Sequence, residues 1–164
     1  MFENSRPLFR SPLAASVSLL LALASDPAAA GPRIETPVVL TPTHPQLEWG
    51  PCPPLFPAGC EIAVLHGDPA KPNADVFFKV PAGYSIPRHW HTSPERMVLV
   101  TGELRVQYDR HSPVVLEAGT YSYGPPRVPH EAACGDAGPC VLFIAFEAPV
   151  DAHAPEDAPK DATE

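Results

Sequence analysis

Four side chains of this sequence could bind one metal ion together: His89, His91, Glu95 and His130. His89 and His91 are separated by a single residue, so on a β-strand both would point to the same face and could converge on one ion. Pro94 should end that strand, because proline cannot donate to a strand ladder. The turn that follows would bring Glu95 back over the same ion.

Three neutral imidazoles and one carboxylate form a nitrogen and oxygen donor set. Such a set suits Fe, Mn, Ni, Cu or Zn and argues against a thiolate-type site. It does not choose among these metals, because intrinsic affinity and supply in the compartment decide which ion is loaded. Four protein ligands on an octahedral ion leave two positions open, one for a substrate oxygen and one for dioxygen or water. The alternative interpretation is that the four residues are ordinary polar loop residues.

Short strands separated by glycine and proline surround these side chains. The 24 prolines among 164 residues disfavour long helices and favour a turn-rich all-β fold. Apolar and polar residues alternate over residues 104–108, which indicates a strand with one buried face. Eight or so short strands of this kind predict a barrel or jelly roll. The expected strands cover residues 38–41, 63–65, 75–80, 97–101, 104–108, 114–116, 121–123, a run that begins at His130, and 141–147.

On these residues the chain resembles the cupin superfamily. The first cupin motif is Gly, five residues, His-x-His, three or four residues, Glu, six residues and Gly. This sequence matches it with Gly83, His89, His91, Glu95 and Gly102. In the second motif Gly119, Pro125 and His130 fit, whereas Arg127 stands where the motif has Gly and Cys134 where it has Asn.

The resemblance covers roughly residues 63–148 and implies a cupin double-stranded β-helix, which is a jelly-roll barrel. It also implies that His89, His91, Glu95 and His130 are the metal ligands, and that the protein forms a homodimer. The short gap between the two motifs and the turn at residues 66–69 are similar to those of small single-domain secreted, periplasmic bacterial cupins.

Composition divides the chain into four segments. Residues 1–30 resemble a secretory signal peptide, with Arg6 and Arg10, an apolar run at 13–24 and small residues at 28–30. This predicts a periplasmic or secreted protein without a stable membrane span after processing, although a retained anchor is the alternative. Residues 31–61 form a proline-rich segment, 62–149 the cupin domain, and 150–164 a disordered acidic tail.

The four cysteines suit an exported chain, since an even number of cysteines in an oxidising compartment predicts disulfides. Four cysteines allow three pairings. We favour Cys52–Cys60 and Cys134–Cys140, because each pair closes a short loop. The alternative concerns Cys134 alone, which has the same strand parity as His130, so that its thiol could face the metal cavity.

Other residues and the net charge limit the possible partners. A net charge of −8 without a basic stripe disfavours nucleic-acid binding. Trp90 lies between the two histidines, so it should point away from the ion and serve in packing. Apolar pocket walls could come from six aromatic residues, although core packing would explain each equally well: Phe78, Tyr84, Tyr108, Tyr123, Phe143 and Phe146.

Three functional hypotheses follow. The first is a metal-dependent oxidoreductase of the dioxygenase type, acting on a small chelating organic substrate such as an enol, phenol or dicarbonyl. The second is a non-catalytic periplasmic module that binds a small ligand or a metal, or serves as a sensor. It is favoured because no acid–base group beyond the ligands, and hence no catalytic residue, can be named. The third, a structural domain with an empty site, is disfavoured because buried charged and polar groups need partners.

Overall fold

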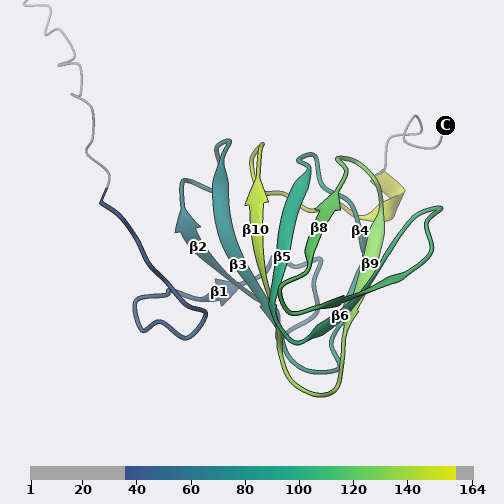
Figure 1. The fold of residues 1–164 in the computed structure, drawn as a ribbon. Coiled ribbons are helices and arrows are strands. Elements are labelled where there is room, and N and C mark those ends of the chain that lie inside the picture. The colour runs from purple at the N-terminus through teal and green to yellow at the C-terminus, as the bar shows by residue number, and fades with distance from the viewer. Residues whose placement is uncertain (1–35, 158–164) are drawn as a thin grey trace, which may run out of the picture. The chain divides into compact units, whose positions relative to one another are not determined.

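The computed structural model describes residues 36–157, and residues 38–157 belong to one compact unit of ten strands and one short 3-10 turn (Figure 1). The expected signal peptide and the last residues of the expected tail, 158–164, lie outside the described residues. Within residues 36–157 we find no helix of the length and apolarity needed to cross a bilayer.

The strands form two antiparallel sheets. The larger sheet has the order β1-β2-β3-β10-β5-β8, and the smaller one has the order β4-β9-β6-β7. The larger sheet contains β1 (Gly50–Pro51), β2 (Glu61–His66), β3 (Ala74–Val80), β10 (Cys140–Phe146), β5 (Glu95–Thr101) and β8 (Tyr121–Gly124). The smaller sheet contains β4 (Ser85–His89), β9 (His130–Cys134), β6 (Glu103–Tyr108) and β7 (Val114–Glu117). This arrangement confirms the expected all-β jelly-roll fold of the double-stranded β-helix type.

Most of the expected strands are present, with ends that differ by a few residues. The exception is the strand expected over residues 38–41, which is absent. Val38 and Val39 are 63% and 87% exposed and have no neighbouring strand, and β-branched residues form a strand only where there is a partner and a surface to pack on. The two-residue strand β1, which pairs with β2, was not expected.

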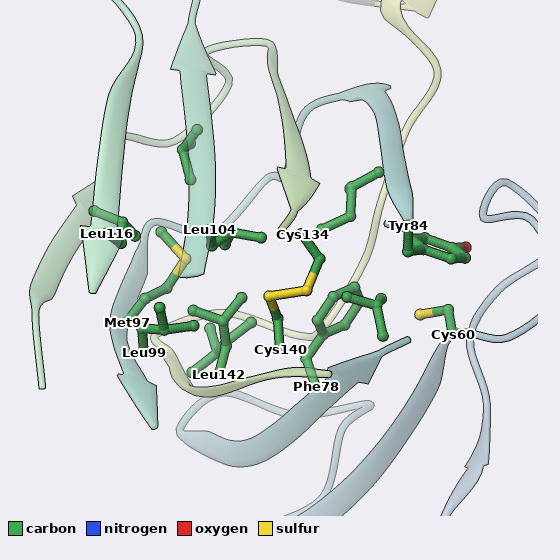
Figure 2. Packing of buried hydrophobic residues seen from close by; sticks show 14 of the residues in the cluster. Cys60, Phe78, Tyr84, Met97, Leu99, Leu104, Leu116, Cys134, Cys140 and Leu142 are labelled. Carbon is green, nitrogen blue, oxygen red and sulfur yellow. A yellow bond between two sulfur atoms is a disulfide. The ribbon is translucent and has the colours of Figure 1, made fainter. Parts of the chain in front are cut away.

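The core lies between the two sheets, where alternate residues of each strand point inward. Leu99 of β5 and Leu104 of β6 are almost fully buried. Figure 2 shows the disulfide Cys134–Cys140 among apolar side chains of this core. Because Cys134 lies in β9 and Cys140 in β10, this bond joins the two sheets.

Both expected disulfides are present, Cys52–Cys60 and Cys134–Cys140. No free cysteine remains among the described residues. The alternative for Cys134, a free thiol facing the metal cavity, is therefore wrong. Its sulfur is bonded to Cys140, whose Cα lies 5.9 Å from that of Cys134.

Gly102 connects β5 of the larger sheet to β6 of the smaller one and has a φ of 87°. A Cβ at this position would lie 2.8 Å from the Pro139 carbonyl oxygen and 2.9 Å from the Cys140 Sγ. Both the conformation and the close approach therefore require glycine. The last glycine of the first motif thus sets the crossing between the sheets, beside the disulfide.

Arg127 stands where the second motif has glycine, and it still adopts the left-handed conformation, with a φ of 63°. Its amide donates a hydrogen bond to the carbonyl oxygen of His91 at 2.8 Å. The turn therefore keeps the glycine conformation with a side chain that is poorly suited to it.

We predict that Arg127→Gly raises the free energy of unfolding by about 0.5–1 kcal/mol. Removing the Cβ relieves roughly 1–2 kcal/mol of steric cost, which the greater flexibility of glycine in the unfolded chain offsets in part. Urea denaturation of the metal-free protein measures the change. Arg127→Ala is the control, because alanine keeps the Cβ. An equal increase in the free energy of unfolding in both variants would show that the strain comes from the arginine side chain beyond Cβ rather than from the backbone conformation.

Candidate metal centre

The expected ligands come from both sheets. His89 ends β4 and pairs directly with His130, the first residue of β9. Glu95 is the first residue of β5 in the other sheet, where it pairs with Gly124 of β8. His91 lies two residues beyond the end of β4. His89 and His91 therefore do not share one strand, contrary to the expectation from the sequence. The bend at residues 92–93, just before Pro94, turns the chain into β5 as anticipated.

The three histidines lie close together and are buried. One ring nitrogen of each lies within 4.8 Å of those of the other two, so His89, His91 and His130 could hold a metal ion. The carboxylate of Glu95 is buried beside them, with Oε1 3.3 Å from His91 Nε2 and Oε2 3.4 Å from His130 Nε2. All four side chains therefore meet at the centre of the fold.

Backbone carbonyls determine which nitrogen of each ring faces the centre. The Nδ1 atom of His89 lies 2.7 Å from the Pro87 carbonyl oxygen, and that of His130 lies 3.2 Å from the carbonyl oxygen of Val128. His91 Nδ1 makes the same kind of contact with the Asp151 carbonyl. A carbonyl oxygen only accepts, so each Nδ1 carries the proton and each Nε2 keeps its lone pair.

At least one of those lone pairs has no partner in the described protein. His91 Nε2 is buried without a hydrogen-bond partner, and a carboxylate beside it offers no proton when ionised. Buried polar atoms are seldom left unpaired in native proteins. A cation is the partner that satisfies three imidazole lone pairs and a carboxylate at once, so the residues fit a metal ion.

Burial sets the protonation of the site. It lowers the pKa of His89 to about 4, with the neighbouring His91 ring as a further cause, and it also lowers the pKa values of His91 and His130. Burial raises the pKa of Glu95 to about 7. The imidazoles are therefore neutral at pH 7, which is the form that binds metals. Burial and the nearby Glu95 carboxylate also raise the pKa of Tyr108.

Residues 150–157, here called the C-terminal segment, were expected to belong to a disordered tail but lie against the site. Trp90 and His153 exchange backbone hydrogen bonds of 3.1 and 2.9 Å, and their rings stack with centroids 4.2 Å apart. The Trp90 indole donates to the Ala154 carbonyl oxygen at 3.0 Å. Trp90 thus serves in packing, as expected, with the C-terminal segment as its partner.

The C-terminal segment also orients a candidate ligand, because its Asp151 carbonyl accepts from His91 Nδ1. The Asp151 carboxylate in turn accepts from the Thr92 amide at 2.9 Å, which fixes the segment beside His91. This role was missed from the sequence, since an Ala/Pro-rich acidic composition gives no sign of a backbone carbonyl contact.

A cavity of about 90 Å³ opens beside the four side chains. Of the six aromatic residues considered for its wall, three line it: Phe78, Tyr108 and Phe146. Tyr84 instead packs in the core and donates to the Pro57 carbonyl oxygen. Tyr123 is half exposed, and Phe143 alternates with the lining residues Leu142 and Ile144 and faces the other side of β10. The lining is predominantly apolar, as in sites for small molecules.

Comparisons with known proteins agree with this architecture. The family model described as the ChrR cupin-like domain matches residues 39–149. A crystal structure of an RmlC-like cupin from Shewanella frigidimarina NCIMB 400 is 25% identical, with a TM-score of 0.53 over 64% of this chain and 86% of that one. No functionally curated protein matches the sequence significantly.

Two more distant structures share the fold. The DMSP lyase DddQ from Ruegeria pomeroyi DSS-3 is 20% identical, with a TM-score of 0.54 over 64% of this chain but only 58% of that one. KdgF from Halomonas sp. is 18% identical, with a TM-score of 0.50 over 61% of this chain and 87% of that one.

We predict that truncation after Pro149 weakens zinc binding about 10- to 100-fold, the usual effect of losing a partner that orients a ligand. The truncation removes the Asp151 carbonyl and frees the His91 ring. Competition with a chromophoric chelator measures the affinity, and circular dichroism checks the fold. Truncation after Asp157 is the control, because it keeps the whole C-terminal segment. Equal zinc affinity in both truncated proteins would show that Asp151 does not position His91.

Proposed function

Because the chain belongs to the ChrR cupin-like family of the cupin superfamily, we propose that it is a metal-dependent oxidoreductase of the dioxygenase type, acting on a small chelating organic substrate. His89, His91, Glu95 and His130 would hold one divalent transition metal ion. The observation that carries this proposal is the convergence of three imidazole lone pairs and one carboxylate in a buried cavity.

The residues of this chain would bind and orient the substrate. The apolar side chains of the cavity, among them Met97 and Phe146, exclude water and accept a small apolar body. All four candidate ligands line this cavity, where an enol, phenol or dicarbonyl oxygen would bind. A bound metal ion would polarise such an oxygen and, if redox-active, would allow chemistry with dioxygen.

The two disulfides support an exported protein that acts outside the cytoplasm. Both disulfides are of the kind that persists in oxidising compartments, which is compatible with secretion. We therefore propose a periplasmic or secreted location. From the resemblance to cupins we also propose that the protein forms a homodimer.

The alternative function is a non-catalytic module that binds a small ligand or a metal. It is favoured by the cavity lining, which beyond the four candidate ligands has few polar groups, with Tyr108 and Asp151 as the titratable ones. Such a module would use the same metal site and the same apolar walls, but it would release its ligand unchanged.

We predict that the purified protein, reconstituted with each of Fe, Mn, Ni, Cu and Zn in turn, holds about one equivalent of at least one metal. His91→Ala should lose most of it, because one of the four donors is removed. Elemental analysis measures the loading, and His111→Ala, which changes an exposed histidine, is the control. Less than about a tenth of an equivalent with every metal would contradict both functions.

Oxygen uptake by the loaded protein with a panel of diketones and catechols then distinguishes the two functions. Metal-dependent uptake that His91→Ala abolishes is expected for an oxygenase. Full metal loading without uptake across the panel would favour the binding module.

A further prediction concerns the pH dependence of metal binding. Because burial raises the pKa of Glu95 to about 7, this carboxyl is protonated at pH 6 and must release its proton when a metal binds. Burial lowers the pKa of His89 to about 4 and also lowers the pKa values of His91 and His130, so Glu95 is the main source of released protons. Apparent zinc affinity should therefore rise about tenfold per pH unit up to pH 7 and then level off.

Zinc titrations at several pH values in two buffers of different ionisation enthalpy measure this proton release by calorimetry. Glu95→Gln is the matched variant, since an amide has no proton to release. A pH dependence of the same size in Glu95→Gln would assign the released proton to another group.

A further inference from the structure

Tyr108 is the last residue of β6, and it pairs directly with His130 of β9. His130 in turn pairs with His89 of β4, so these three side chains form one row across the smaller sheet. The Tyr108 ring lies 4.8 Å from the His130 ring, centroid to centroid. Tyr108 therefore extends the row of candidate ligands by one residue and lines the same cavity.

The hydroxyl group of Tyr108 is buried and makes no hydrogen bond of ordinary geometry. The Ser122 side chain lies near enough to lower the Tyr108 pKa, but no hydrogen bond of ordinary distance and angle joins the two residues. Leaving such a group unpaired destabilises a folded protein. The cavity is the space from which a partner could reach it.

Gly124 of β8 makes room for this hydroxyl. A Cβ at Gly124 would lie 2.6 Å from the Tyr108 hydroxyl oxygen and 3.1 Å from Glu95 Oε2. The phenol oxygen and the carboxylate therefore approach the same backbone position, one from each sheet.

We propose that the Tyr108 hydroxyl donates a hydrogen bond to an oxygen atom of the small molecule that binds at the metal. Tyr108 would then be a specificity-determining residue that favours ligands with an anionic or carbonyl oxygen on a small apolar body. The proposal rests on the proposed metal site, and it requires neither dioxygen nor turnover.

The test uses the full chain loaded with Co(II), whose visible absorption spectrum reports on ligands that enter its coordination sphere. Acetate is the probe with an oxygen that accepts a hydrogen bond, and imidazole is the probe that binds through nitrogen and offers no such oxygen. We expect Tyr108→Phe to weaken acetate binding about 10-fold or more, as for loss of a hydrogen bond to a charged group. Imidazole binding and cobalt stoichiometry should stay unchanged. Tyr121→Phe, at an exposed tyrosine of β8, is the control and should change neither acetate binding nor imidazole binding.

Several results would overturn the inference. Equal weakening of acetate and imidazole would show that Tyr108 only supports the structure of the site. Unchanged acetate affinity in Tyr108→Phe, or no spectral response of the wild-type protein to acetate, would show that the hydroxyl does not contact such a ligand. Failure of the wild-type protein to bind cobalt or any other metal would instead refute the proposed function itself.

Discussion

The structure depends on how three buried imidazole rings are oriented. Each ring donates its Nδ1 proton to a backbone carbonyl, so that the three Nε2 lone pairs face a common point. Three such lone pairs and a carboxylate would be unfavourable in an apolar interior without a cation. The fold supports this arrangement with donors from both sheets, the rings of His89 and His130 from the smaller one and the Glu95 carboxylate from the larger one.

The two sheets meet where these groups lie. His89 and His130 pair across β4 and β9, while Glu95 enters from β5 of the other sheet. The crossing from β5 to β6 needs the tight conformation of Gly102, and the Cys134–Cys140 bond fixes the sheets near it. The residues that bring the sheets together thus stabilise the geometry of the candidate ligands as well.

Much of this could be predicted from local sequence. The motif spacing predicted which four polar side chains meet, and the alternation over residues 104–108 predicted a strand with one buried face. The pairing of the four cysteines was predicted from the short loops that the two disulfides close. The remaining features depend on contacts between distant segments. Asp151 contacts His91 through its backbone carbonyl, which every residue type has, so the sequence does not indicate this contact. The position of Tyr108 beside His130 follows from the register of β6 and β9, which the spacing of the motif residues does not reveal.

The proline-rich segment has a consequence for how the protein matures. Cys52 and Phe56 line the cavity, and the Phe56 ring packs edge-on against His89 with centroids 5.0 Å apart. The Cys52–Cys60 bond closes this segment into a loop at the start of β2. A newly made chain with reduced thiols lacks that covalent closure, and one wall of its cavity is held by packing alone. Oxidation of the thiols therefore adds a covalent constraint to this wall of the cavity.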